Sequence, residues 1–469
     1  MSGPARPAKK FDRSLIEGPI GPAVWKLAWP TMLQNIFGGL QGMVDHAMVG
    51  HFVGYNGNAA IGVSWQIFLV VMVFISSLFT GMGVLVARFA GAGDSVKANR
   101  TVYQAFLTST VISFLILAPL GYFLSPTLLE FVKATPGVRA EALPYLRTMF
   151  VFSFGMMTFF MLGGALRSAG DAKTPLRYGI ALTILNIVLN AILIRGLGPI
   201  PAFGTAGAAM GTVIAGGILA VVAFQRLITG HWVVGFPRHE SWKPDWEVIR
   251  SLFRFGLPTG LQGIAMNVGG VLLLRYIGEL AVSAEAQAAY SVGYSQLFSL
   301  ITWTSVGLMG AAAAVVGQNL GAHQPDRAVA AVGVASRIGL AMAAVLGLAF
   351  VAIPRVLLAV FGMTDPAVVD IAVRLLQFLS VSGFFITTAL TYTGGLQGAG
   401  DTRSPFFISV ASQIAVPLGL LTVLSMIRPL SPIDIWVAIL LGHATRCGLS
   451  VIRFRQGRWR AIRVDIAKA

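Results

Sequence analysis

The sequence predicts an all-α polytopic membrane protein, with twelve transmembrane helices in two pseudo-symmetric lobes of six. Three observations predict this fold class. The 469-residue chain is 56% hydrophobic and only 11% charged, and its mean hydropathy is +0.77, which is too apolar for a soluble protein of this size. Long apolar segments alternate with short polar connections. The two halves of the chain also share motifs in the same order.

Twelve apolar segments lie between clusters of charge, glycine and proline, and each is long enough to cross the ~30 Å hydrocarbon core as a helix. They cover residues 25–53, 60–88, 102–124, 141–166, 176–197, 206–229, 247–276, 285–317, 328–352, 367–396, 406–427 and 432–454. The expected organisation is a cytoplasmic N-terminal segment over 1–24, an N-lobe over 25–229, a cytoplasmic linker over 230–246, a C-lobe over 247–454 and a basic cytoplasmic tail over 455–469.

The basic residues predict the orientation. Net charge is +16, and most of the 34 lysines and arginines flank the segment ends that face the cytoplasm if the N-terminus is inside. We therefore expect a multi-pass protein of the cell inner (plasma) membrane with both termini cytoplasmic. Because the basic residues gather on no soluble domain, we expect no nucleic-acid partner. The arginine-rich tail suits anionic lipid headgroups, although positive-inside anchoring explains it equally well.

The chain repeats itself. PTMLQNI from Pro30 recurs as PTGLQGI from Pro258, FAGAGD has a looser counterpart in NLGAHQPD, and LRSAGDAKTP from Leu166 recurs as LQGAGDTRSP from Leu396. Two copies of a six-helix unit insert the same way up, an arrangement typical of transporters. The GAGD-type turns predict helix C-caps at the glycines and caps for the next helix at the aspartates, namely Gly91, Gly93, Gly170, Gly400, Asp94, Asp171 and Asp401.

Asp45 lies well inside the first predicted helix. Steps of three or four residues place Asp45, Gln41 and Gln34 on one stripe that faces away from lipid. The repeat puts Leu273 at the equivalent position of the second half, so the acid has no counterpart. A lone acid at this depth indicates function. The alternative is a structural acid that is hydrogen-bonded to a neighbouring helix.

The fifth and sixth predicted helices offer partners for Asp45. Asn186 and Asn190 are four residues apart and share a helix face, and Thr212 can add a hydroxyl. These oxygens suit sodium, or a proton held on Asp45, and the residue types do not choose between them. If sodium is the coupling ion, Asp45, Asn186 and Asn190 would bind it. Polar contacts between helices are the alternative for each asparagine. No HExxH, CxxC or GxSxG motif is present, so we expect no enzyme and no cofactor besides the coupling ion, H⁺ or Na⁺.

Four residues of the second half are candidates for a substrate cavity. Tyr290 and Tyr294 lie one helical turn apart, and Met266 and Asn267 interrupt the seventh apolar segment. Such side chains suit a hydrophobic, cationic or aromatic substrate. Packing against lipid or against the core explains them as well.

These patterns together resemble the multidrug and toxic compound extrusion (MATE) transporters. The likeness rests on Pro30 with Asp45 in VDHAMVGH, the AGAGD and LRSAGDAKTP turns, the asparagine pair and the AGAAMGT segment from Ala206. It implies two lobes around a central cavity, an ion-binding region at Asp45, Asn186, Asn190 and Thr212, and a bend of the first helix at Pro30. The buried acids of the NorM branch in the seventh and tenth helices are absent, so the chain looks closer to the DinF-like branch.

The resulting expectation is a monomeric secondary transporter. It would exchange protons or sodium for small organic cations or other amphipathic compounds by alternating access. Membrane lipids are the other expected partners. A lipid-linked oligosaccharide flippase of the same superfamily is an alternative, but it would need several arginines in the middle of the helices, where almost none occur. A membrane receptor or scaffold is a further alternative, which would not require a lone buried acid.

Overall fold

The computed structural model describes residues 11–236 and 243–466, and these form two compact helical units. Unit 1 contains 36–257 together with 11–13 and 465–466, and unit 2 contains 14–35 and 258–464. Two long helices therefore contribute to both units: α2 (Ile20–Phe52) and α10 (Trp246–Gly278). Within the described residues the only β-type pairing is one isolated bridge between Leu197 and Ile200.

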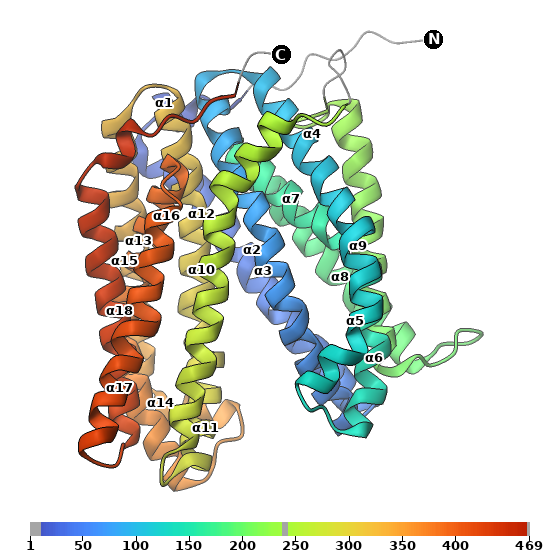
Figure 1. Ribbon diagram of the computed structural model, residues 1–469, viewed down its shortest axis with the longest axis vertical. Helices are drawn as coiled ribbons and strands as arrows, with labels where there is room; N and C mark the ends of the chain where they lie inside the picture. Colours follow the sequence, from blue (N-terminus) through green and yellow to red (C-terminus); the bar gives the residue numbers. More distant parts are fainter. Residues whose placement is uncertain (1–10, 237–242, 467–469) are drawn as a thin grey trace. The chain divides into compact units, whose positions relative to one another are not determined.

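Unit 1 contains the second part of α2 and seven further helices before α10. α8 and α9 run side by side, and α3 packs on α6 and α7 (Figure 1). A π-helical turn, η1 (Ile112–Leu117), joins α4 to α5, so the two form one continuous rod. The bounds are α3 (Tyr55–Ala92), α4 (Ser95–Val111), α5 (Ala118–Phe131), α6 (Pro136–Val151), α7 (Phe154–Ser168), α8 (Lys173–Arg195) and α9 (Gly204–Thr229).

Unit 2 is built around α15, which packs on α12, α13 and α18 (Figure 1). Gly394 and Gly398 lie four residues apart on α15 and face the backbone of α12 at Met309 and Ala313, where any side chain would collide. The bounds are α1 (Ser14–Glu17), α11 (Ser283–Tyr290), η2 (Ser291–Leu297), α12 (Ser299–Gly321), α13 (Pro325–Ala352), α14 (Pro354–Val360), α15 (Pro366–Ala399), α16 (Arg403–Val410), η3 (Ala411–Ala415), α17 (Val416–Ile427), α18 (Pro432–Arg455) and η4 (Arg458–Ala461).

The twelve predicted spans all correspond to helices of the described chain. Ten helices or continuous rods are long and apolar enough to cross a membrane, and α6 with α7 forms an eleventh span bent by 53°. The twelfth predicted span is α2, which is not among these eleven, but its 33 residues reach ~50 Å at 1.5 Å per residue, more than the hydrocarbon core requires. The sequence placed this span at 25–53, close to the observed Ile20–Phe52.

Three of the predicted glycine caps are confirmed. Gly93, Gly170 and Gly400 have φ values of 76°, 101° and 94°, in the left-handed region that favours glycine. The prediction for Gly91 is wrong, because Gly91 lies inside α3, and only Gly93 takes the left-handed backbone. In the looser second-half turn, His323 has a φ of 59°, so this turn uses a residue with a side chain.

The aspartate after each of these three glycines caps the next helix, as predicted. Oδ1 of Asp94 accepts from the Lys97 amide at 3.0 Å, and Asp171 accepts from the Thr174 amide at 3.0 Å. Asp401 accepts from the Ser404 amide at 3.2 Å. A side-chain acceptor for an otherwise unpaired helix amide stabilises a helix start by about 0.5–2 kcal/mol. The repeated motif is therefore explained by helix ends.

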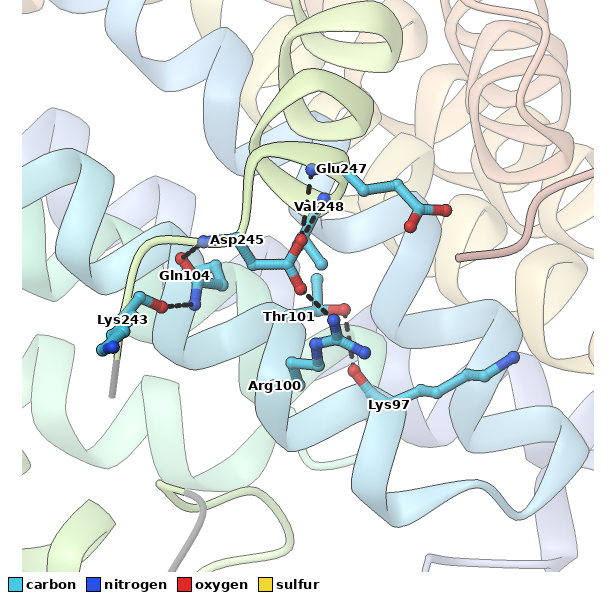
Figure 2. Close-up of polar contacts among 8 residues, drawn as sticks. All are labelled: Lys97, Arg100, Thr101, Gln104, Lys243, Asp245, Glu247 and Val248. Atoms are coloured by element: carbon cyan, nitrogen blue, oxygen red, sulfur yellow. Dashed lines mark hydrogen bonds and ion pairs between the residues drawn. The ribbon is translucent and has the colours of Figure 1, made fainter. Parts of the chain in front are cut away.

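The end of the linker is held on α4 (Figure 2). Gln104 donates to the Lys243 carbonyl at 2.9 Å and accepts from the Asp245 amide at 3.1 Å. Arg100 forms an ion pair with Asp245. Asp245 in turn accepts from the amides of Glu247 at 3.1 Å and Val248 at 3.3 Å, which caps α10. The polar first turns of α4 therefore fix the point at which α10 begins, whereas 237–242 of the predicted linker lie outside the described residues.

Candidate functional site

Unit 1 brings the predicted ion-coupling residues into contact. Asp45 is half-buried on α2. Asn186 and Asn190 occupy successive turns of α8, and both side chains are fully buried. Thr212 lies on α9, the neighbour of α8. The spacing of four residues on α8 is what points both amides to the same side.

The shortest contact in this group joins Asn190 to the acid. Nδ2 of Asn190 donates to Oδ1 of Asp45 at 2.7 Å. The other amide atom, Oδ1 of Asn190, is buried and has no hydrogen-bond partner among the described residues. A buried acceptor without a donor costs free energy. The group therefore holds one donor committed to Asp45 and one oxygen that remains available.

The Asn186 amide is satisfied with its nitrogen toward an ionised Asp45, whereas the opposite orientation places its oxygen against the carboxylate and suits only a protonated acid. With its nitrogen toward Asp45, at 3.0 Å from Oδ1, its oxygen accepts from the backbone amide of Thr212 at 3.2 Å and from Oγ1 of Thr212 at 2.9 Å. With its oxygen toward Asp45, its nitrogen donates to Oγ1 of Thr212 at 2.9 Å, and the oxygen accepts from Asn190 at 3.3 Å. The Thr212 hydroxyl serves both orientations because it is donor and acceptor.

Gly211 lets α9 approach Asn190 this closely. A Cβ atom built at Gly211 would collide with Oδ1 of Asn190 and lie 3.1 Å from its Cγ. Gly207, one turn earlier, faces the Leu193 carbonyl of α8 in the same way. Sequence reasoning used the AGAAMGT segment only for the family likeness. Its small residues at a spacing of four were the signal for a close helix contact.

Gln41 joins the group from the α2 side. Its Oε1 accepts from Oγ1 of Thr183 at 3.1 Å, and the Asn186 amide atom that faces Asp45 lies 3.3 Å from its Nε2. Sequence reasoning missed Thr183, which lies three residues before Asn186 and therefore on the same face of α8. Polar side chains of α2 therefore contact polar side chains of α8 at two places, Gln41 with Thr183 and Asp45 with Asn190.

The other predicted cavity or hinge residues lie in unit 2. Pro30 is buried inside α2, which continues through it, and Gln34 is half-buried on the same helix. Met266 and Asn267 are exposed on α10, and Asn267 donates to the Gly263 carbonyl of its own helix at 2.9 Å. This internal bond provides a structural explanation for Asn267. The roles of Pro30, Gln34 and Met266 stay predictions.

Tyr290 and Tyr294 belong to a buried aromatic and cationic cluster that the sequence did not reveal. Their rings stack with centroids 4.9 Å apart, and Tyr294 and Phe298 both stack on His443 of α18. Arg446, one turn further along α18, is 1% exposed, and its Nε and Nη1 have no hydrogen-bond partner among the described residues. The sequence signal was a histidine and an arginine three residues apart inside a predicted span.

Comparison with known proteins agrees with this architecture. The MatE family model matches residues 30–192 and 258–421, one match in each half of the repeat. The probable multidrug resistance protein NorM of Thermotoga maritima is 26% identical over 445 residues, which cover 92% of each chain. Multidrug resistance protein MdtK of Pectobacterium atrosepticum is 24% identical over 434 residues, 92% of this chain and 94% of that protein.

A solved structure shares the fold. A MOP superfamily transporter from Pyrococcus furiosus superposes with a TM-score of 0.88 at 19% sequence identity, over 97% of this chain and 100% of that chain. At this identity the likeness concerns the fold alone. The family match, however, covers well over half of the sequence and both copies of the repeat. The chain therefore belongs to the MatE family of multidrug and toxic compound extrusion transporters.

Proposed function

We propose that the protein is a proton-coupled antiporter that exports small cationic or amphipathic compounds across the inner membrane by alternating access, with both termini in the cytoplasm. Family membership supports efflux, and the basic flanks of the helices support the orientation. The observation that carries the choice of the proton is the pair of amides around Asp45. Asn190 donates to Oδ1 at 2.7 Å, and Asn186 presents either its nitrogen or its oxygen at 3.0 Å from the same atom.

The two orientations of Asn186 match the two protonation states of Asp45. An ionised carboxylate only accepts hydrogen bonds, so it is best matched by the Asn186 nitrogen. A protonated acid can donate, and the Asn186 oxygen then accepts from it. In each case Thr212 satisfies the remaining amide atom. Neither state leaves this amide unpaired, so the group can take up and release a proton without a large penalty in hydrogen bonding.

Sodium fits the group less well. A hard cation requires several oxygens that converge on one point. Here the group supplies one carboxylate, and the Asn190 nitrogen faces that carboxylate. Sodium would require the Asn190 amide to turn its unpartnered oxygen toward the ion.

Competition for one carboxylate provides the coupling. A proton from the outside neutralises Asp45, and release to the cytoplasm restores the negative charge that favours a cationic substrate. A ligand shifts a conformational equilibrium only by its differential affinity for the two states. The inward movement of one charge across 100 mV supplies about 2.3 kcal/mol when the exported compound is neutral. Exchange of one proton for one monovalent cation moves no net charge and is driven by the pH gradient, at about 1.4 kcal/mol per pH unit. One proton per cycle is therefore a useful driving force.

The test is transport in proteoliposomes with an imposed pH gradient and a fluorescent organic cation as substrate. Asp45→Asn keeps the size and hydrogen bonding of the side chain but cannot exchange a proton, so we expect proton-driven transport to be lost. Glu279→Gln is the matched control, since it neutralises an exposed carboxylate just after α10 that pairs with Arg275 near the end of that helix. Undiminished proton-driven transport by Asp45→Asn would overturn the proposal. Transport driven by a sodium gradient alone would overturn the assignment of the proton.

A further inference from the structure

A second site lies in unit 2, where α18 ends. A cavity of about 520 Å³ opens between α13, the C-terminal end of α18 and η4, and its size is within the range of small-molecule pockets. Its charged wall consists of Arg337 of α13, Arg455 of α18 and Arg460 of η4, and its aromatic wall includes Tyr392, Phe454 and Trp459. We call it the α18 pocket.

The aromatic wall of the α18 pocket is rigid. Gly457 has a φ of 71° and ends α18, so that η4 turns back over the helix. Trp459 is only 1% exposed, stacks on Phe454 at 4.8 Å and donates from Nε1 to the Phe454 carbonyl at 2.7 Å. Tyr392 meets the edge of Phe454 at 5.3 Å. The arginines therefore stand beside a preformed apolar surface, which reduces the entropic cost of binding a ligand.

The charged wall has too few acidic partners. Arg337 and Arg455 are exposed and have no ion-pair partner among the described residues. Arg460 lies 3.3 Å from Asp326, but that carboxylate is 91% exposed, and exposed pairs contribute little. Planar guanidinium groups bind phosphate oxygens in a bidentate manner. The pocket therefore favours an anionic ligand, and a phosphate in particular.

The position of Arg337 indicates that the anion comes from the bilayer. α13 has 28 residues and is ~42 Å long, about 12 Å more than the hydrocarbon core. Arg337 follows the start of α13 by ~18 Å. If the polar first turn of α13 carries the excess length, the Arg337 backbone lies ~6 Å inside the core, within reach of the headgroups for an extended arginine. An arginine at this depth is costly without a partner.

We propose that the α18 pocket binds the phosphate headgroup of an anionic phospholipid from the cytoplasmic leaflet. Arg337 and Arg455 contact the phosphate, with Arg460 at the rim. The glycerol and the first carbons of an acyl chain lie along Tyr392 and the exposed side of Val329. The choice of leaflet rests on the proposed orientation of the chain and not on the proposed transport chemistry. The site is separate from the Asp45 group, which belongs to unit 1.

The experiment uses the purified full-length protein in detergent, with binding of phosphatidylglycerol followed by native mass spectrometry. Phosphatidylcholine with the same acyl chains tests the lipid charge, and glycerol 3-phosphate tests a soluble phosphate. The double variant Arg337→Gln with Arg455→Gln should weaken phosphatidylglycerol binding by tenfold or more, since each change removes a charge-assisted hydrogen bond to the phosphate. Arg458→Gln is the matched control, because Arg458 is exposed on η4 but lies outside the pocket lining.

Each outcome decides the proposal. Weakened binding in the double variant, with Arg458→Gln unchanged, supports it, and so does recovery of binding in Arg337→Lys with Arg455→Lys. Equal weakening in the Arg458→Gln control would mean that binding depends on overall surface charge, which would overturn the proposed site. Glycerol 3-phosphate that binds as tightly as the lipid would overturn the lipid assignment in favour of a soluble anion. Thermal unfolding of every variant separates lost binding from a lost fold.

Discussion

Gly211 provides a direct test of the geometry around Asp45. In Gly211→Ala the new methyl group would collide with Oδ1 of Asn190, 3.1 Å from Cγ and 3.2 Å from the backbone nitrogen of the same residue. The backbone nitrogen is fixed within α8, so either the Asn190 amide or α9 must move. Either movement disturbs the 2.7 Å hydrogen bond from Asn190 to Asp45.

The expected cost follows from three terms. Alanine is favoured over glycine inside a helix by about 1 kcal/mol. An extra methyl group in a tightly packed contact costs about 1–3 kcal/mol, and loss of a hydrogen bond to a charged group costs about 1.5–3 kcal/mol. The net loss in the free energy of unfolding is therefore about 1.5–5 kcal/mol. The apparent Tm in detergent should fall by several degrees, and proton-driven transport should fall with it.

Gly217→Ala is the control on the same helix. No heavy atom lies within 4 Å of a Cβ atom at Gly217, so this change brings the gain in helix propensity without a collision. We expect its Tm to be unchanged or slightly higher and its transport to match the wild type. Thermal unfolding and proteoliposome transport would be measured for both variants in parallel. If Gly211→Ala behaved like Gly217→Ala in both assays, the close approach of α9 would not be what holds the Asn190 amide on Asp45.

Three further changes test other parts of the structure. Asn186→Leu removes the amide that suits both protonation states of Asp45, so proton-driven transport should fall by about tenfold or more. Thermal unfolding should still report a folded protein. Unchanged transport would contradict the proposed reorientation of the amide. Arg446→Leu removes a buried charge with two unpartnered nitrogens, and the apparent Tm should hold or rise; a marked fall would mean that the charge is satisfied. Asp245→Ala removes the ion pair with Arg100 and the cap on α10, which should cost about 2–4 kcal/mol in thermal unfolding, whereas Asp245→Asn should cost less because an asparagine still caps.

The positions of the helices could be predicted from the sequence because a helix that crosses the bilayer must be apolar over the thickness of the hydrocarbon core. Apolar length sets the spans, and a glycine followed by an aspartate marks their ends, as at Gly400 and Asp401. The breaks inside the spans did not follow. The bend between α6 and α7 and the π-helical turn η1 leave the apolar composition unchanged, so no periodicity indicated them. The two glycines of AGAGD were likewise indistinguishable until the backbone dihedral of Gly93 separated them.

The contents of the Asp45 group were partly predictable for the same reason. A spacing of four residues fixed Asn186 and Asn190 on one face of α8, and the cost of unpaired amides in lipid required polar partners. The direction of each amide depends on α9, which approaches through Gly211, and on the Thr212 hydroxyl. Those are tertiary contacts: the glycine spacing of AGAAMGT signals a close helix contact, but no local pattern gives the direction of each amide. The depth of Arg446 was missed because composition alone does not show whether an arginine inside a span extends toward the headgroups or faces the core.

The internal repeat shows which polar groups belong to the scaffold. Asp171 and Asp401 occupy equivalent turns and cap equivalent helices, so helix capping explains an aspartate at this position in both halves. Asp45 has no such equivalent, since the repeat places the buried Leu273 there, and the buried Arg446 interacts with Tyr294 and His443. A duplicated scaffold has no structural need for a carboxylate in one unit and a buried guanidinium in the other. Because each is costly in a membrane, the requirements of the fold alone explain neither group.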